Sequence, residues 1–270
     1  MVTVHNFSYG LLNPLLGYAM SCLGSFLGLR CVILGRAYEG AARARWLALA
    51  AVAIGAVGIW SMHFIAMLGF TIPGEPIRYN VFTTIASMLL AVAVVGVGLF
   101  IVGFGNGGWP RLLTGGAIIG VGVAAMHYLG MAAMSMPMSI SYNLPLVAVS
   151  VLIAIVAGTT ALWIGTWVRS ITATVGAAFI MGVAVTGMHY TGMAALHVTA
   201  GAMSSASAAS TGFSSVSGAT AGDFLVPLLL VISLATFLLT LSISMQPGEE
   251  EIRADAEMRR RLEFLERRNQ

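Results

Sequence analysis

Apolar runs of about twenty residues, separated by short polar breaks, fill most of the chain between residues 10 and 245. Runs of this length predict membrane-spanning helices, because a hydrocarbon core about 30 Å thick is crossed by roughly 20 helical residues. The pattern therefore predicts an all-α, polytopic membrane protein with seven transmembrane helices. The segments cover about residues 10–34, 46–70, 80–104, 111–136, 143–167, 171–198 and 223–245.

Charged residues are scarce and lie mostly between the apolar segments. The chain is 58% hydrophobic and 9% charged, whereas soluble domains carry roughly 25% charged residues. This composition indicates a protein embedded in the lipid bilayer, and we expect no nucleic-acid partner. Between Trp46 and Met245 the charged residues are Glu75, Arg78, Arg111, Arg169 and Asp223.

Arginines in the short connections predict the orientation of the chain. They concentrate between segments one and two, three and four, and five and six, and positive charge is enriched on the cytoplasmic side. We therefore predict an external N-terminus and a cytoplasmic C-terminus. Residues 199–222 are then a flexible external loop, and residues 246–270 a charged, helical cytoplasmic tail. The arginines concerned are Arg36, Arg43, Arg45, Arg111 and Arg169.

One short motif occurs three times, at residues 58–67, 122–131 and 184–193. Each copy contains Met-His-aromatic, any residue, a small residue and Met, and the histidines are 64 and 62 residues apart. Near-constant spacing indicates a repeated structural unit, and an ionisable residue within apolar helices indicates a functional site. The histidines are His63, His127 and His189.

Each repeat is predicted to be a pair of helices with the motif near the external end of the second. The units cover about residues 10–70, 79–136 and 142–198, followed by a seventh helix at 223–245 within a membrane domain of residues 1–245. The units point the same way, and parallel repeats are related by an axis along the membrane normal. At 1.5 Å per residue, each histidine lies about 24–27 Å above the cytoplasmic end of its helix. We therefore predict that the three histidines meet at one depth in the outer leaflet.

The motif brings imidazole and thioether donors together. On a helix, the histidine and the methionine four residues later project on one face, and the methionine before each histidine can flank the same cavity. Thioether sulfur suits Cu(I) and imidazole suits copper, whereas the motif has no carboxylate or cysteine for zinc and no oxygen ligands for calcium or magnesium. Haem also takes His and Met axial ligands, but three equivalent histidines are more than one haem uses. The predicted copper ligands are His63, His127, His189, Met62, Met67, Met126, Met131, Met188 and Met193.

Other residues near the motif are assigned to the cavity or to packing. Met134 belongs to a methionine run that could either collect Cu(I) or pack the helix end, and His197 is assigned to the solvated surface. Trp60 has no counterpart in the other copies and is assigned to packing. The aromatic residues after the histidines are predicted to be cavity walls or interfacial anchors, and tyrosines can also donate hydrogen bonds. They are Phe64, Tyr128 and Tyr190.

Residues 126–131 and 188–193, which read Met-His-Tyr-any-Gly-Met, resemble the MHYT domain, an integral-membrane sensor module of bacteria. Residues 58–64 and 142–143 are similar to the same family, and the resemblance covers about residues 10–200. It implies a multi-pass protein of the bacterial cytoplasmic membrane. It also implies that Met, His and Tyr residues bind copper and sense oxygen, carbon monoxide or nitric oxide.

Many members of this family join the module to a cyclic-di-nucleotide synthase or phosphodiesterase, or to a histidine kinase. About twenty-two residues follow Gly248, so we predict a non-enzymatic sensor that signals to a cytoplasmic partner through residues 249–270. Two other functions stay open. One is copper transport, and the other is a structural or scaffolding role in which the histidines form interhelical hydrogen bonds.

Overall fold

The computed structural model describes residues 4–105, 108–136, 138–200 and 218–244, together with Met258. Seven helical spans within them are long and apolar enough to cross a membrane. The predicted all-α, seven-helix membrane fold is therefore confirmed. The helical segments are α1 (Leu12–Gly35), α2 (Gly40–Val52), η1 (Ala53–Trp60), α3 (Ser61–Met67), α4 (Val81–Gly103), α5 (Trp109–Ala132), α6 (Leu144–Trp167), α7 (Ile171–Ala194), η2 (Ala221–Leu225) and α8 (Val226–Ser244).

The second span is continuous but changes its helical type. It runs through α2, the π-helical segment η1 and α3, and the hydroxyl of Ser61 donates to the carbonyl of Ala56 at 2.9 Å where the π segment ends. The sequence pattern placed the start of this span at residue 46, whereas helix α2 begins at Gly40. Arg43 and Arg45 therefore lie in the first turns of α2, where long arginine side chains can reach the polar boundary of a membrane.

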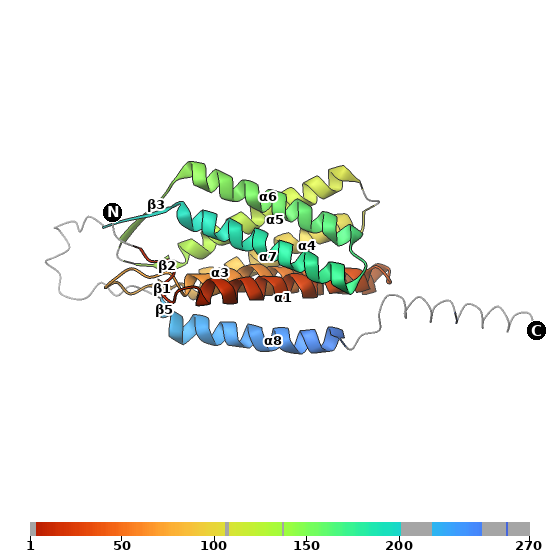
Figure 1. Ribbon diagram of the computed structural model, residues 1–270, viewed down its shortest axis with the longest axis horizontal. Coiled ribbons are helices and arrows are strands. Elements are labelled where there is room, and N and C mark those ends of the chain that lie inside the picture. Colours follow the sequence, from red (N-terminus) through yellow and green to blue (C-terminus); the bar gives the residue numbers. More distant parts are fainter. Residues whose placement is uncertain (1–3, 106–107, 137, 201–217, 245–257, 259–270) are drawn as a thin grey trace, which may run out of the picture.

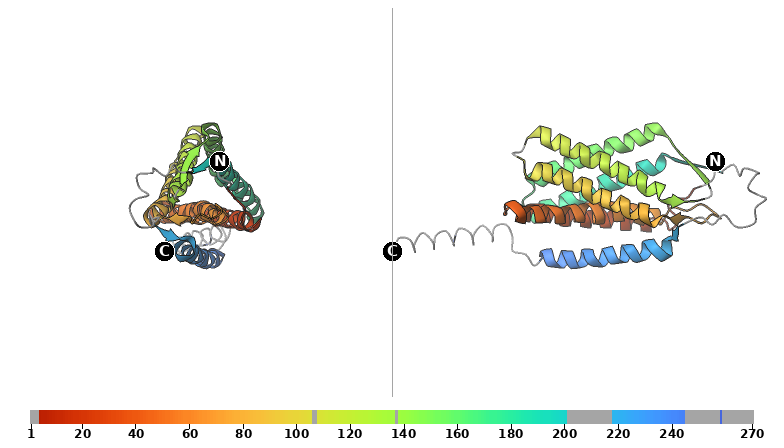
Figure 2. Two further views of the ribbon diagram at one scale, coloured as in Figure 1. Left: turned by 90° about the vertical axis from the view of Figure 1, so that its left-hand side faces the viewer. Right: turned by 180° about the vertical axis from the view of Figure 1, so that it is seen from behind.

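Six of the spans form a closed ring. Each packs against the next along the chain from α1 to α7, and α7 packs against α1 to close the ring. Seen end-on, the helices follow three sides of a triangle, and α8 lies outside it (Figure 2). Helix α8 contacts α1, η1 and α3. The ring is consistent with three two-helix units and a seventh helix, as predicted.

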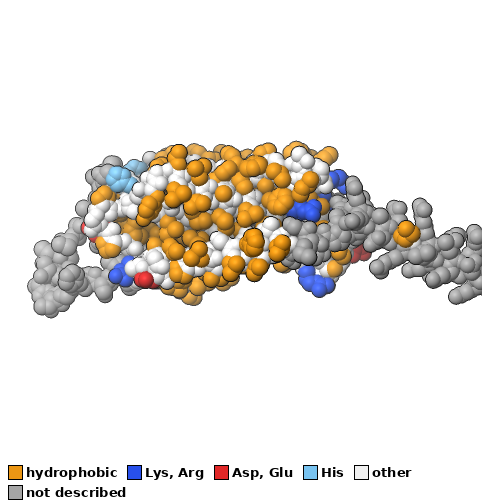
Figure 3. All heavy atoms as spheres, turned by 60° about the horizontal axis from the view of Figure 1, so that its bottom comes forward, with side chains coloured by type: hydrophobic (Ala, Val, Ile, Leu, Met, Phe, Trp, Pro, Cys, Tyr) orange, Lys and Arg blue, Asp and Glu red, His pale blue; other side chains and the backbone are white. Residues whose placement is uncertain are grey.

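The outer surface of the ring is apolar along most of its length. Large hydrophobic side chains such as Phe82, Leu152 and Val183 are 82%, 60% and 62% exposed. Figure 3 shows hydrophobic side chains over the middle of one face and charged side chains toward its two ends. A lipid environment accounts for this distribution, because exposed apolar patches of this extent are rare on soluble monomers.

Five short strands lie at one end of the ring, here called the strand end (Figure 1). The opposite end holds Arg36, Arg43 and Arg169 and is called the arginine end. The sixth helix was predicted to reach residue 198 but ends at Ala194, because the following strand pairs with β3 instead of continuing the helix. The strands are β1 (Arg78–Tyr79), β2 (Met134–Ser135), β3 (Met138–Tyr142), β4 (Leu196–Ala200) and β5 (Ala219–Thr220), paired antiparallel in the orders β2-β1-β5 and β3-β4.

Two predicted segments lie mainly outside the described residues. Of the loop predicted at 199–222, residues 201–217 are not described, and the last residues form β5 and the start of η2. Of the tail predicted at 246–270, only Met258 is described. The domain boundaries drawn from the sequence stay predictions.

Candidate metal centre

The three motif histidines occupy equivalent places in three helices. His63, His127 and His189 lie in the last two turns of α3, α5 and α7, next to the strand end. All three are buried, with exposed fractions of 1%, 0% and 1%. The prediction that the repeats bring these side chains to one level inside the bundle is confirmed.

The three imidazole rings converge through their Nδ1 atoms. Nδ1 of His63 lies 3.1 Å from Nδ1 of His189 and 3.1 Å from that of His127, and the remaining pair is 3.3 Å apart. Two nitrogens that bind one ion at 2.0–2.1 Å with a tetrahedral angle are about 3.3–3.4 Å apart. The spacing of the three nitrogens therefore suits ligands that share one ion, and the triad can hold a metal.

Hydrogen bonding alone cannot satisfy this triangle. A ring nitrogen of neutral imidazole either donates its N–H or accepts through its lone pair, and it cannot do both. Among three Nδ1 atoms that face one another, at least one pair must then set donor against donor or acceptor against acceptor. A bound cation removes the conflict, because all three lone pairs can point to it at once.

The outward nitrogens of two histidines rest on glycines of the next repeat. A methyl group added at Gly130 would meet Nε2 of His63 at 2.5 Å, and one added at Gly192 would meet Nε2 of His127 at 2.4 Å. Neither Nε2 atom has a hydrogen-bond partner among the described residues. Metal-binding histidines usually donate their second N–H to a polar group that orients the ring. Here packing against the glycine backbone fixes the ring instead.

In two of the three copies this contact explains the small residue of the motif more specifically than close helix packing does. The small residues at the equivalent position are Ala66, Gly130 and Gly192. The sequence indicated small residues for helix approach, but the contact with the neighbouring ring depends on side-chain rotamers that spacing does not reveal. The two glycines therefore belong to the site as positioning residues.

The aromatic residue after each histidine packs against the imidazole ring of that histidine. Each stands edge-on to its own histidine, with ring centroids 4.7–4.9 Å apart and interplanar angles of 79–88°. Each also contacts a second aromatic ring toward the strand end, and their role as cavity walls stays a prediction. The pairs are Phe64 with Tyr79 at 6.2 Å, Tyr128 with Tyr142 at 5.5 Å and Tyr190 with Phe7 at 5.4 Å between centroids.

Tyr79 and Tyr142 belong to a repeated Tyr-Asn pair, of which the sequence resemblance includes only the copy at 142–143. Burial raises the pKa of Tyr79 and that of Tyr142 above the ordinary tyrosine value, so both hydroxyls stay neutral at physiological pH. Asn80 and Asn143 cap α4 and α6 with their side chains. The backbone N–H of each donates, at 2.8 Å, to a carbonyl just past the motif helix of its own repeat. The pair thus ties the two helices of a repeat together at the strand end.

Polar bonds from the motif region link neighbouring repeats. The indole N–H of Trp60 donates to the hydroxyl of Ser87 at 3.0 Å, and the hydroxyls of Tyr128 and Ser150 are 2.7 Å apart. Ser87 and Ser150 occupy equivalent positions in their repeats. Phe64, the counterpart of Tyr128, has no hydroxyl group, and Trp60 makes the hydrogen bond to the serine in its place. Trp60 is therefore not only a packing residue.

Replacement of Tyr128 by phenylalanine is expected to lower the free energy of unfolding by about 0.5–1.5 kcal/mol, the usual contribution of one hydrogen bond. The Ser150 hydroxyl keeps its bond to the carbonyl of Val147 at 2.8 Å. Denaturant titration in detergent measures the change. Affinity for a metal ion at the triad should stay the same, and a loss of metal binding in this variant would show that the Tyr128 hydroxyl contributes to the site.

The motif methionines are buried, and their role as ligands stays a prediction. All six are at most 4% exposed. Met188 also lines a cavity that extends from the site toward the arginine end. Met134 is 7% exposed within β2, and His197 is half-buried in β4, where its Nδ1 lies 3.2 Å from the carbonyl oxygen of Ala195.

The chain matches a family model described as "MHYT: Bacterial signalling protein N terminal repeat". The matched units cover residues 57–115, 120–178 and 182–253, and each begins a few residues before a motif. In the repeats predicted above, the motif helix comes second. In the matched units the motif helix comes first, so the units are offset by one helix and the third includes α8. In the structure it is α1, not α8, that packs beside α7 and closes the ring.

Several signalling proteins are similar to this chain over about two thirds of its length or more. The bifunctional diguanylate cyclase/cyclic di-GMP phosphodiesterase MucR of Pseudomonas aeruginosa is 39% identical over 77% of this chain and 30% of its own length. The cyclic di-GMP phosphodiesterase NbdA of the same organism is 36% identical over 67% of this chain and 24% of its own length. The signaling protein YkoW of Bacillus subtilis is 32% identical, over 67% and 23%.

The chain thus spans less than a third of the length of these relatives. No solved structure matches it. The motifs, the three buried histidines and the matched repeats agree with one another. The chain belongs to the MHYT family of bacterial membrane signalling proteins.

Proposed function

We propose that this protein is a membrane sensor module that holds one copper ion, as Cu(I), through His63, His127 and His189. The observation that carries the proposal is the convergence of three Nδ1 atoms at 3.1–3.3 Å in a buried site. Copper is chosen over zinc because each motif carries methionines one residue before and four residues after its histidine, all of them buried, and contains no carboxylate or cysteine. The external orientation of the site rests on the arginine distribution.

A haem is a poorer match for this arrangement. Two axial ligands of one haem bind the iron from opposite faces of the macrocycle. The three Nδ1 atoms instead point to one another across 3.1–3.3 Å. This separation suits one small ion.

Each histidine belongs to a different repeat, which gives the ion a way to report its state. An ion shared by the triad links all three repeats, so its occupancy or its binding of oxygen, carbon monoxide or nitric oxide would change how the repeats pack. A signal requires that the ligand bind two packing states with different affinity. A cytoplasmic partner acting through residues 249–270 would receive that change.

Copper transport is less well supported. The cavity that leads from Met188 toward the arginine end is lined mainly by aliphatic side chains and reaches Arg36, Arg43 and Arg169. A cation on this path would lose its hydration without gaining ligands and would meet positive charge. These surroundings favour a site that keeps its ion.

Copper titration of the purified full chain, under anaerobic and reducing conditions with a competing chelator, tests the proposal. We expect one tightly held ion per chain, and little displacement of copper by zinc. Carbon monoxide added to the loaded protein should give a bound C–O stretching band in the infrared spectrum. Failure to retain copper, or uptake of copper into sealed vesicles that carry the protein, would contradict the sensor assignment.

A further inference from the structure

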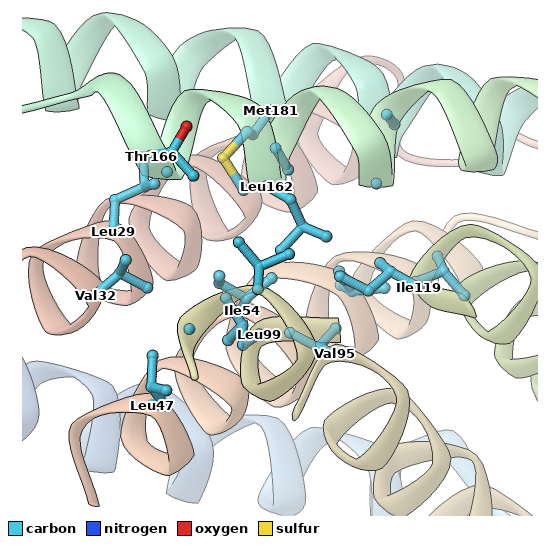
Figure 4. A pocket seen from close by; sticks show the side chains of 18 of the residues that line it. Leu29, Val32, Leu47, Ile54, Val95, Leu99, Ile119, Leu162, Thr166 and Met181 are labelled. Carbon is cyan, nitrogen blue, oxygen red and sulfur yellow. The ribbon is translucent and has the colours of Figure 1, made fainter. Parts of the chain in front are cut away.

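A second feature of the ring interior lies between the histidine triad and the arginine end. It is a cavity of about 290 Å³, near the lower limit of small-molecule pockets at roughly 300 Å³. Side chains from α1, α2, η1, α4, α5, α6 and α7 line it, most of them aliphatic, as Leu99, Ile119 and Leu162 illustrate in Figure 4. Along α6 it extends from Ala154 to Thr166, which is about 18 Å at 1.5 Å per residue.

One end of this cavity is positively charged. Arg36, Arg43 and Arg169 line it, and none of the described lining residues is acidic. Arg36 donates to the carbonyls of Gly165 and Val168, which anchors it to the end of α6. The Arg43 guanidinium lies 5.6 Å from the centroid of the Phe104 ring. The cavity therefore combines a long apolar wall with a basic mouth.

A thin wall separates the cavity from a groove on the outer surface of the ring. A groove between α6 and α7 shares four residues with the cavity, namely Ala157, Ala161, Met181 and Ala184. Three of the four are alanines, so only small side chains cover much of this wall. A molecule dissolved in the surrounding lipid could enter here without crossing water.

We infer that this cavity binds an anionic amphiphile with a single inserted acyl chain, with its anionic group at Arg43 and Arg169. The acyl chain would lie along the aliphatic wall, where its burial is favourable, and the carboxylate or phosphate would meet guanidinium groups suited to such anions. The tip of the chain would approach Met188, the residue before His189. Occupancy would then act on the packing of the same helix that carries a triad histidine.

Binding of radiolabelled palmitate to the delipidated full chain in detergent tests this site, with hexadecanol as the uncharged analogue. Wild type should prefer palmitate by about tenfold or more, because hydrogen bonds between guanidinium and carboxylate are stronger than those a neutral hydroxyl makes. The double variant R43Q/R169Q should lose that preference and still bind hexadecanol. Ala157→Leu, which fills the shared wall, should weaken both ligands.

Arg45→Gln is the matched control, because Arg45 lies on the same helix as Arg43 and does not line the cavity. It should bind palmitate like wild type. If the double variant does not fold, the wild-type comparison decides, and equal affinity for palmitate and hexadecanol overturns the inference. Displacement of palmitate by phosphatidylglycerol would support the inference and would identify a phospholipid as the source of the acyl chain. Unchanged binding in both R43Q/R169Q and Ala157→Leu would also overturn it.

Discussion

Replacement of His127 by alanine is expected to reduce copper affinity by at least about 100-fold. Loss of a residue that merely orients a metal ligand already costs roughly 10–100-fold, and this substitution removes one of the three converging Nδ1 atoms. Saturating copper should also stop protecting the protein against unfolding, since a ligand at 100 times its Kd stabilises by about 2.7 kcal/mol. Chelator competition and thermal unfolding with and without copper measure the two effects.

His197→Ala is the matched control, because His197 lies in β4, outside the triad. It should leave copper affinity unchanged. The structural alternative predicts a different pattern, in which His127→Ala destabilises the protein by the same amount whether or not copper is present. Equal copper affinity in wild type and His127→Ala would remove the triad as the metal site.

Replacement of Gly192 by alanine is expected to disturb the site without touching any ligand. The added methyl group would lie 2.4 Å from Nε2 of His127, so the ring must shift from its position in the triad. Overpacking of this kind typically costs about 1–3 kcal/mol. Copper affinity should fall by about 10–100-fold, as it does when ligand-orienting contacts are lost.

Gly187→Ala on the same helix separates this effect from a general intolerance of α7. A methyl group at Gly187 would meet nothing within 4 Å, and it is expected to leave both stability and copper binding nearly unchanged. Gly130→Ala should reproduce the effect of Gly192→Ala, through His63. Normal copper binding in both Gly130→Ala and Gly192→Ala would show that the glycine contacts do not position the rings.

The convergence of the histidines could be predicted because it depends on spacing and direction alone. Repeats of 64 and 62 residues, each crossing the membrane twice, must place their motifs at one end and one depth. The predicted spans followed from hydropathy in the same way. What hydropathy could not indicate is which helix closes the ring beside α7, because α1 and α8 are both apolar spans and only packing distinguishes them.

The finer parts of the site escaped prediction because they depend on rotamers and local backbone type. Nothing in the motif shows that Nδ1 rather than Nε2 faces inward, or that Gly192 supports the ring of His127. Trp60 has no counterpart in the other motifs, so the sequence indicated packing. In the structure its indole N–H binds Ser87, as the hydroxyl of Tyr128 binds the equivalent Ser150 in the next repeat. The five strands were missed because they are only two to five residues long.

X-ray absorption at the copper edge of the reduced, copper-loaded full chain tests the central claim most directly. Three imidazoles sharing one ion predict a first shell dominated by nitrogen, with the multiple-scattering pattern of imidazole rings. That pattern should be lost in His127→Ala and retained in His197→Ala. A first shell of sulfur alone, or an imidazole pattern that survives in His127→Ala, would contradict the account.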